Sequence, residues 1–313
     1  MDSVIAIIGP TAVGKTKISI DLAKRFDTEI ISGDSMLLYR GMNIGTAKPT
    51  ITEQSGIIHH MIDILEPTEE FSVVDFQETA AKYISDINMQ GKTPILAGGT
   101  GLYVKALLEG YKFNSTSGCC EKRSEMEALA SKFGNQYLHN MLAEVDPQNA
   151  ARLHPNDIRR VIRALEVFHL SGNALNQSKL LSDTNKLVYK AIVVGLTMNR
   201  RALYDRINRR VDKMIEDGLV EEVAELMRRG VPEQAQAMQG IGYKEIVAYL
   251  KGDIDLSVAI DQIKQATRRF AKRQLTWYRK MDYTVWFDVD DFSDYDIMLE
   301  TFYRHIAGKL CVK

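Results

Sequence analysis

The sequence predicts an α/β fold, with a parallel-sheet core of the P-loop NTPase type and a helical insertion domain. Three observations predict it. An apolar run at residues 4–8 leads directly into a glycine-rich motif at residues 9–16. Later strand-like runs alternate with helix-length segments, which is the pattern of βαβ units in a parallel sheet. Residues 114–189 show helical periodicity and no convincing strand, so we expect a core of residues 1–113 and 190–313.

The individual elements follow from hydrophobic periodicity and from breaker residues. Short β-branched apolar runs are typical of central parallel strands, and glycines mark where two of them end. The predicted strands are residues 4–8, 29–32, 93–97, 191–196 and 284–287. The predicted helices of the core run from the glycine loop to about Phe26 and over residues 74–89, 101–110, 201–229, 256–281 and 295–309.

Composition narrows the possible functions. The chain has 313 residues, with 40 Lys and Arg against 41 Asp and Glu, so its formal net charge is −1. Any nucleic-acid surface must therefore be a local patch. Its three cysteines show no disulfide or zinc spacing, which favours a reducing compartment. No apolar run approaches the roughly 20 residues of a membrane span, so we expect a cytoplasmic protein without membrane contact. We also expect it to act as a monomer.

The motif at residues 9–16, GPTAVGKT, matches the P-loop pattern GxxxxGK[ST] and has the required strand before it and helix after it. Backbone N–H groups of such a loop converge on a phosphate, Lys15 adds positive charge, and the Thr16 hydroxyl can bind Mg²⁺. The residues expected to bind the phosphate are Gly9, Thr11, Ala12, Val13, Gly14, Lys15 and Thr16. The motif is shared by ATP-binding proteins, kinases and other transferases, so it identifies the ligand class and not the reaction.

Two polar residues follow predicted strands at the edge where a ligand should bind. Asp34 follows the second strand, and Thr100 follows the third. Ligands of doubly wound sheets bind beyond the carboxyl ends of the strands. Asp34 could act as a general base or hold Mg²⁺, or it could be a helix cap or turn residue. Thr100 could direct its hydroxyl at a phosphate or cap the helix that starts at Gly101.

The densest basic stretch lies near the C-terminus. Six positive charges fall on one side of the predicted helix: Arg268, Arg269, Lys272, Arg273, Arg279 and Lys280. Such a face fits the phosphates of a nucleic acid, and a solvated face paired with acids elsewhere is the alternative. Two smaller basic clusters occur at residues 159–163 and at Arg206, Arg209 and Arg210.

Seven segments in a fixed order resemble one family over nearly the whole chain. They are GPTAVGKT (9–16), SGDSMLLYRGMNIGTAKP (32–49), HHMIDI (59–64), GGTGLYVKALLEG (98–110), HPNDIRRVIRALEVF (154–168), QGIGYKE (239–245) and RRFAKRQLTWYRK (268–280). The set resembles the tRNA dimethylallyltransferases, or tRNA isopentenyltransferases. The resemblance implies transfer of a dimethylallyl group from dimethylallyl diphosphate to N6 of adenosine 37, beside the anticodon of tRNA. The products would be N6-isopentenyladenosine and diphosphate.

The resemblance also implies roles for single residues. The P-loop would hold the diphosphate of the donor rather than ATP, Asp34 would be the base at the adenine amine, and Thr100 would contact the diphosphate bridge. The residues implied to contact the anticodon stem-loop are Asp34, Ser35, Met36, Leu37, Arg159, Arg160, Val161, Ile162, Arg163, Gln239, Gly240, Ile241, Gly242, Tyr243 and Lys244. The basic helix would hold tRNA phosphates, and there we select Arg268, Lys272 and Arg273.

Charge on the departing diphosphate must be stabilised, and loop amides, Lys15, Mg²⁺ and an arginine can supply this. We place Arg206 in the catalytic set, with Arg210 as the alternative, because both follow the 191–196 strand. The family usually has a proline- and acid-containing run before a further functional arginine. Residues 114–123 match it loosely, so either Arg123, which we also place in the catalytic set, or Lys122 takes that position.

Two other functions stay open from the sequence. An adenylate isopentenyltransferase would prenylate a free nucleotide with the same loop, aspartate and donor. The chain length, the helical insertion and the basic helix favour tRNA instead. A P-loop NTPase or nucleotide switch would need an apolar strand ending in an acidic residue that holds Mg²⁺, and we find no clear one.

Overall fold

The computed structural model describes residues 1–113, 120–171 and 186–310. The chain forms two compact units. The larger contains Met1–Gly110 and Asn185–Lys313, and the smaller contains Tyr111–Thr184. The boundaries predicted from the sequence, near residues 113 and 190, each lie a few residues after the observed ones.

The larger unit is built on a parallel sheet of six strands in the order β3-β2-β4-β1-β5-β6. The strands are β1 Ser3–Ile8, β2 Ile30–Ser32, β3 His59–His60, β4 Ile95–Ala97, β5 Lys190–Thr197 and β6 Thr284–Asp288. All ladders are parallel, as the alternation of strands and helices predicted. The α/β fold class is therefore confirmed, and the two-residue edge strand β3 is the one strand of the described sheet that the pattern missed.

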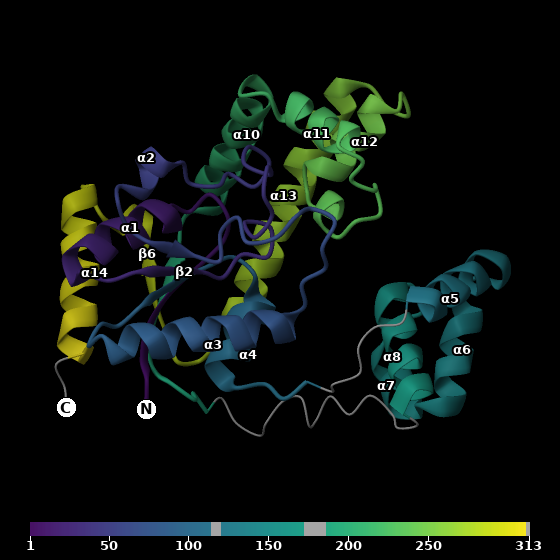
Figure 1. Ribbon diagram of the computed structural model, residues 1–313, viewed down its shortest axis with the longest axis horizontal. Coiled ribbons are helices and arrows are strands. Elements are labelled where there is room, and N and C mark those ends of the chain that lie inside the picture. Colours follow the sequence, from purple (N-terminus) through teal and green to yellow (C-terminus); the bar gives the residue numbers. More distant parts are fainter. Residues whose placement is uncertain (114–119, 172–185, 311–313) are drawn as a thin grey trace. The chain divides into compact units, whose positions relative to one another are not determined.

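Helices cover both faces of this sheet. One apolar core joins the sheet to α1 Lys15–Phe26, α10 Arg200–Glu216 and α14 Tyr295–Leu310, and Figure 1 shows α14 beside α1. The opposite core includes α3 Val73–Met89 and α4 Gly101–Glu109. α3 starts at a capping box in which Ser72 and Asp75 satisfy each other's backbone N–H groups. These two cores hold the sheet rigidly, and with it the strand ends from which the site loops extend.

A third core lies beyond the sheet and joins α10 to α11 Leu219–Arg228, α12 Tyr243–Leu250 and α13 Leu256–Tyr278. The smaller unit has its own apolar core, built by helices α5 Cys120–Phe133, α6 Asn135–Val145, α7 Pro147–Arg152 and α8 Ile158–Ser171. Within the described residues this unit contains helices and no strand, as its periodicity predicted.

Two helix predictions were wrong in extent. The segment 201–229 is not one helix but two, because Gly218 adopts a left-handed conformation with φ of 100° between α10 and α11. The basic helix ends at Tyr278, so Arg279 caps it and Lys280 lies beyond it. The short helix α2 Ile51–Gln54, closed by a capping box of Thr50 and Glu53, was also missed, because a single turn gives too little periodicity to detect.

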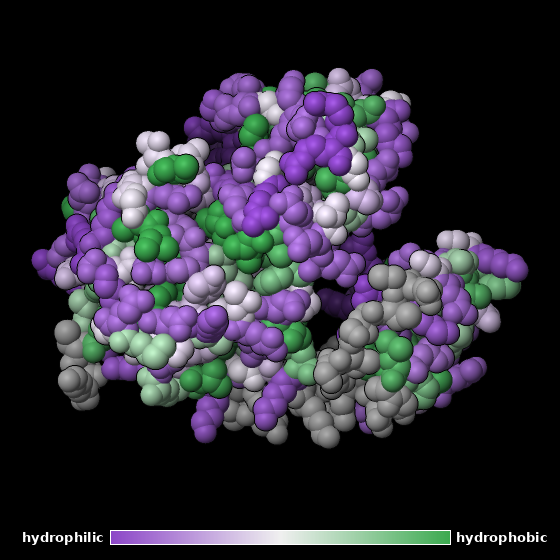
Figure 2. All heavy atoms as spheres, in the orientation of Figure 1, coloured by the Kyte–Doolittle hydropathy of each residue, from purple (hydrophilic) through white to green (hydrophobic). Residues whose placement is uncertain are grey.

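The visible face of the larger unit is mostly hydrophilic in Figure 2, and hydrophobic residues form small separate groups on it. Among the described helices, none combines the length and the apolar character that a membrane crossing requires.

Phe302 on α14 tests how the last helix stabilises the sheet. Its ring is fully buried and contacts Phe287 and Phe292, at centroid distances of 4.8 and 5.8 Å. We expect Phe302→Ala to lower the free energy of unfolding by about 3–5 kcal/mol through the cavity it leaves. Urea denaturation measures this. Ile297→Ala, on the same helix but 56% exposed, should change it by less than about 0.5 kcal/mol. Equal effects of the two variants would contradict the assignment.

Candidate active site

The strand order places three predicted site segments next to one another. The loops that follow β2, β4 and β1 carry Asp34, Thr100 and Lys15, and these are adjacent strands of the sheet. The turn after β4 packs directly against the end of β2, because a Cβ at Gly98 would lie 2.4 Å from the Gly33 carbonyl oxygen. The Gly33 N–H donates to Ala97, and its carbonyl accepts from the Thr100 N–H. No residue with a side chain fits at position 98.

The P-loop has the geometry of an anion site. Gly14 is the N-cap of α1, no side chain caps this helix, and its first turn contains no acidic residue. The free N–H groups and the positive end of the helix dipole are therefore available to a phosphate. Lys15 Nζ donates to the carbonyl oxygens of Gly9 and Pro10, at 2.9 and 2.8 Å. Thr16 is exposed at the same helix start.

Asp34 and Thr100 organise the facing loop. Asp34 Oδ1 accepts from the Met36 N–H at 2.9 Å. This bond closes a local turn, which is one of the alternative roles that the sequence allowed for Asp34. Its Oδ2 lies against the next loop, 3.2 Å from where a Cβ of Gly99 would stand. Thr100 Oγ1 accepts from the Ser35 N–H at 3.0 Å and makes no cap bond to its own helix. Thr100 therefore holds the loop that carries Asp34.

A second cation, Arg210 of α10, shares the site electrostatically with Lys15 and Asp34. Burial lowers the pKa of Lys15 to about 8, the negative charge of Asp34 opposes this shift, and the charge of Arg210 adds to it. Burial also lowers the pKa of Arg210, again opposed by Asp34. Arg206 is exposed one turn earlier, and the described residues offer it no hydrogen bond or ion pair. Of the two candidate arginines, Arg210 is the one that interacts electrostatically with Lys15 and Asp34.

Helix α13 contributes two residues that sequence reasoning missed. Gln274 is buried, its Oε1 accepts from the Thr11 N–H, and its Nε2 donates to the Gly99 carbonyl, both at 2.8 Å. Tyr278 is also buried, and its hydroxyl donates to the Gly98 carbonyl at 3.2 Å. A signal was present in the sequence, since Ala271, Gln274 and Tyr278 form a buried stripe opposite the basic face. A glutamine in such a stripe needs polar partners.

Tyr243, one of the residues implied to contact tRNA, has a structural role. Its side chain is buried, and its hydroxyl donates to Glu222 Oε1 at 2.6 Å. The carboxylate of Glu222 also accepts the N–H groups of Asn43, Ile44 and Gly45, at 2.8, 2.8 and 3.1 Å. Burial and the charge of Glu222 raise the pKa of Tyr243, so its hydroxyl stays protonated. This side chain therefore braces a loop, and the contact of Tyr243 with tRNA stays a prediction.

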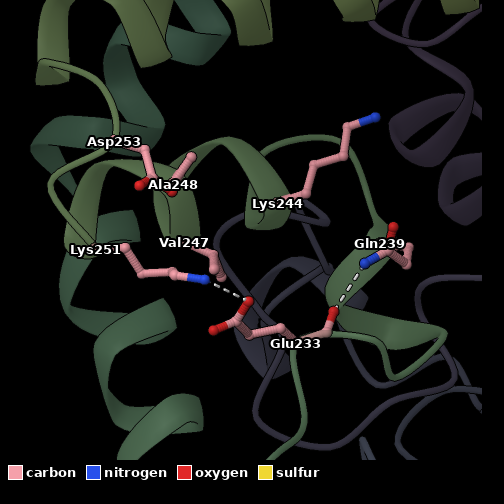
Figure 3. A pocket seen from close by; sticks show the side chains of 7 residues that line it. All are labelled: Glu233, Gln239, Lys244, Val247, Ala248, Lys251 and Asp253. Carbon is pink, nitrogen blue, oxygen red and sulfur yellow. Dashed lines mark hydrogen bonds and ion pairs between the residues drawn. The ribbon is translucent and has the colours of Figure 1, made fainter. Parts of the chain in front are cut away.

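The neighbours of Tyr243 are divided between packing and exposure. Gly240 lies against Met36, since a Cβ there would stand 2.5 Å from the Met36 methyl carbon, so two segments implied to contact tRNA touch each other. Gly242 is buried, and Ile241 is partly buried in the same core. Gln239 and Lys244 line a surface pocket (Figure 3). Gln239 Nε2 donates to the Glu233 carbonyl, and Glu233 pairs with Lys251 across that pocket.

Leu37, three residues after Asp34, is half-buried. It lines a small cavity together with Thr16 of the P-loop, Ser32 and His59. The HHMIDI segment thereby contributes to the surroundings of the P-loop.

The basic face of α13 is largely open to solvent. Arg269, Lys272 and Arg273 all reach the surface, so they are available to a polyanion. Arg268 is half-buried, and its guanidinium donates to Asn208 Oδ1 at 2.6 Å, which ties α13 to α10. Arg279 and Lys280 are exposed too, at the end of the helix, so five of the six predicted charges reach the surface.

In the smaller unit, the predicted tRNA segment of α8 is split between surface and core. Arg159 and Arg160 are exposed, and Arg160 pairs with Asp157 at 3.0 Å. Val161 and Ile162 are buried in the helical core, and their contact with tRNA stays a prediction. The two faces of α8 follow from its amphipathic sequence.

Arg123 and Arg163 form ion pairs with Glu166, at 3.0 and 2.6 Å, and Glu166 is fully buried. A buried carboxylate requires such partners. Lys122 instead pairs with Glu125 on the exposed side of α5. Arg123 therefore has a structural partner within its own unit, and its catalytic role stays a prediction. Most of residues 114–123, where the family pattern is loose, lies outside the described residues.

Comparison with known proteins assigns the family. The model of the IPP transferase family matches residues 37–281, more than half of the sequence. The chain belongs to the IPP transferase family. A tRNA dimethylallyltransferase from Bacillus anthracis is 52% identical over 313 residues, covering 100% of this chain and 98% of that protein. One from Caldanaerobacter subterraneus subsp. tengcongensis is 47% identical over 309 residues, covering 98% of each. The resemblance stated from the seven segments is confirmed.

Solved IPP transferase structures share the fold of this one. The tRNA isopentenylpyrophosphate transferase of Bacillus halodurans is 48% identical with a TM-score of 0.75, covering 99% of this chain and 97% of that chain. A eukaryotic dimethylallyltransferase that acts on tRNA is 29% identical with a TM-score of 0.81, covering 99% and 79%. The NTPase alternative is also weakened by the geometry, because the two neighbours of β1 lead into Gly98 and Met198 and not into an acidic residue.

The lowered pKa of Lys15 predicts a pH dependence of anion binding. As the pH rises through about 8, Lys15 loses its positive charge, so the affinity for inorganic diphosphate should fall. Lys15→Arg keeps its charge over this range and should lack that decline. Calorimetry gives the Kd of both proteins from pH 6.5 to 9.5. The ratio of the wild-type Kd to the Lys15→Arg Kd at each pH removes the effect of the ionisation of diphosphate itself, because that effect is the same for both proteins. A ratio that does not change with pH would contradict the shift.

Proposed function

We propose that this IPP transferase moves the dimethylallyl group of dimethylallyl diphosphate to N6 of adenosine 37 in tRNA, and that Asp34 and the P-loop form its reaction centre. The observation that carries the proposal is that Asp34, Thr100 and Lys15 follow three adjacent strands of the sheet, and that the charges of Asp34 and Arg210 both act on Lys15. One anion and two cations suit a reaction that removes a proton at one point and releases diphosphate at another.

Asp34 is the proposed base. The N6 lone pair of adenine is delocalised into the ring, so the amine is a weak nucleophile, and a carboxylate that accepts its proton makes attack easier. Asp34 Oδ1 is held by the Met36 N–H, which leaves Oδ2 as the oxygen directed at the amine. The Thr100–Ser35 hydrogen bond keeps this loop in place.

The departing diphosphate is the proposed ligand of the P-loop. Carbon 1 of the donor is allylic, so its bond to oxygen can break before the new bond to nitrogen is complete, and negative charge then gathers on the leaving group. The free N–H groups at the start of α1, together with Lys15 and Arg210, stabilise that charge. Lys15 must exchange its present bonds to Gly9 and Pro10 for bonds to the anion. Arg206 remains the other candidate for the arginine.

Mg²⁺ is the proposed cofactor, with Thr16 as its protein ligand. Throughout the described part of the chain, no three His, Cys, Asp or Glu side chains group into a metal site. This fits a cation that takes few ligands from protein and the rest from phosphate oxygens and water. When bound, Mg²⁺ would neutralise part of the diphosphate charge.

Recognition of tRNA is proposed to use surface residues of both units: Met36, Arg159, Arg160, Gln239, Lys244, Arg269, Lys272 and Arg273. The target base is stacked in the anticodon loop and must swing out to reach Asp34, as for other enzymes that modify a base. The buried residues Val161, Ile162 and Tyr243 would support these contacts from behind.

Transfer of label from radioactive dimethylallyl diphosphate tests the acceptor and the base together. With unmodified tRNA and AMP offered separately, we expect label in tRNA only. Asp34→Asn should lower kcat by roughly 10²–10⁴-fold, because the amide cannot accept the proton. Asp27→Asn is the matched control, since Asp27 is exposed and has the left-handed backbone that Asn tolerates. Label in AMP would indicate a free-nucleotide enzyme, and full activity of Asp34→Asn would remove Asp34 as the base.

The basic face of α13 predicts a salt dependence of tRNA binding. Replacing Arg269 and Arg273 together by Ala should weaken binding and reduce the slope of log Kd against log salt by roughly 0.7–0.9 for each phosphate that is no longer bound. Filter binding at several salt concentrations measures the slope. Arg304→Ala, exposed on α14, should leave it unchanged. An unchanged slope in the double variant would show that tRNA does not use this face.

A further inference from the structure

A single buried side chain connects the P-loop to the turn after β4. Gln274 accepts the Thr11 N–H with its oxygen and donates to the Gly99 carbonyl with its nitrogen. Both bonds are 2.8 Å long, and the residue is only 4% exposed. Gly99 in turn lies against Asp34 Oδ2. Gly99 is therefore the one residue between the side-chain amide of Gln274 and the proposed base.

The bond to Thr11 has a consequence for the P-loop. Its N–H is directed at Gln274, so Thr11 anchors the loop and leaves phosphate binding to the amides that follow. The next residue, Ala12, has a φ of 66°, a left-handed conformation that a non-glycine residue adopts at a cost. Such conformations persist where the surroundings hold them, and the Gln274 hydrogen bond constrains the residue directly before it.

The bond from Gln274 to Gly99 holds the turn after β4 in place. The Gly99 carbonyl precedes Thr100, which holds the Asp34 loop through Ser35. Tyr278, one turn after Gln274 on the same buried stripe, donates to the adjoining Gly98 carbonyl at 3.2 Å. Two successive carbonyl groups of the turn are therefore bound by α13.

We infer that Gln274 is a positioning residue that sets the distance between the anion-binding loop and the loop of the base. Its two hydrogen bonds keep the P-loop in its strained conformation and in register with the Gly98–Gly99 turn. This inference rests on the proposed function for its kinetic consequences. Its structural consequence, order in residues 9–16, does not depend on the reaction.

Gln274→Met keeps the size of the side chain and removes both hydrogen bonds. Amide hydrogen exchange of the segment 9–16, followed by mass spectrometry in the absence of substrate, should become faster in this variant. The control Gln265→Met lies on the exposed side of α13 and should leave exchange unchanged. In the transfer assay, Gln274→Met should lose roughly 10²-fold in kcat, the effect of a misplacement near 1 Å, with tRNA affinity retained.

The Gln274→Glu variant shows whether lost activity comes from the lost hydrogen bonds of Gln274 or from a general loss of stability. A protonated carboxyl can accept from Thr11 and donate to Gly99, whereas a carboxylate can only accept and would repel the Gly99 carbonyl. Burial favours the protonated form as the pH falls. The activity of this variant relative to wild type should therefore rise several-fold between pH 8 and pH 5.5. Gln274→Met and Gln265→Glu should show no such rise.

The outcomes distinguish the inference from the proposed function. Unchanged exchange in Gln274→Met, or a flat relative profile in Gln274→Glu, overturns the inference. If wild type transfers no label to tRNA, the proposed function fails, and the exchange result alone still decides whether Gln274 orders the P-loop.

Discussion

The site depends on the close approach of two backbone turns at the ends of β2 and β4. Gly98 stands directly against Gly33, and hydrogen bonds run between the turns in both directions. A Cβ at position 98 would separate them, and with them Asp34 and Thr100. Because β4 lies between β2 and β1, this contact also sets where the base stands relative to the P-loop. The glycines that end the strand in the sequence are thus the structural centre of the site.

Helix α13 has two faces with different roles, one buried and one exposed. Its buried stripe, with Gln274 and Tyr278, binds the P-loop and the Gly98–Gly99 turn through hydrogen bonds. Its outer face carries Arg269, Lys272 and Arg273, which suit a polyanion. A rigid helix keeps these two faces at fixed positions, so phosphates bound outside would hold a defined place relative to the loop inside.

Burial gives the charges of the site their strength. Lys15 and Arg210 are both desolvated, which disfavours their charged forms, and Asp34 compensates in each case. An anion that binds beside them would be attracted in a medium where charges are weakly screened. Glu222 applies the same principle away from the reaction centre, where three backbone N–H groups and the Tyr243 hydroxyl satisfy one carboxylate and hold the 43–45 loop.

The sequence by itself determined the fold class, the P-loop and the strand-end positions of Asp34 and Thr100, because periodicity and glycine breaks are local signals. It also supported the family through seven ordered segments. Only the tertiary structure separated Arg210 from Arg206, since one helical turn decides which guanidinium is shielded from solvent and interacts with Asp34. Only packing placed Val161, Ile162 and Tyr243 inside and tied Gln274 to the P-loop, because partners 263 residues apart leave no trace in local sequence.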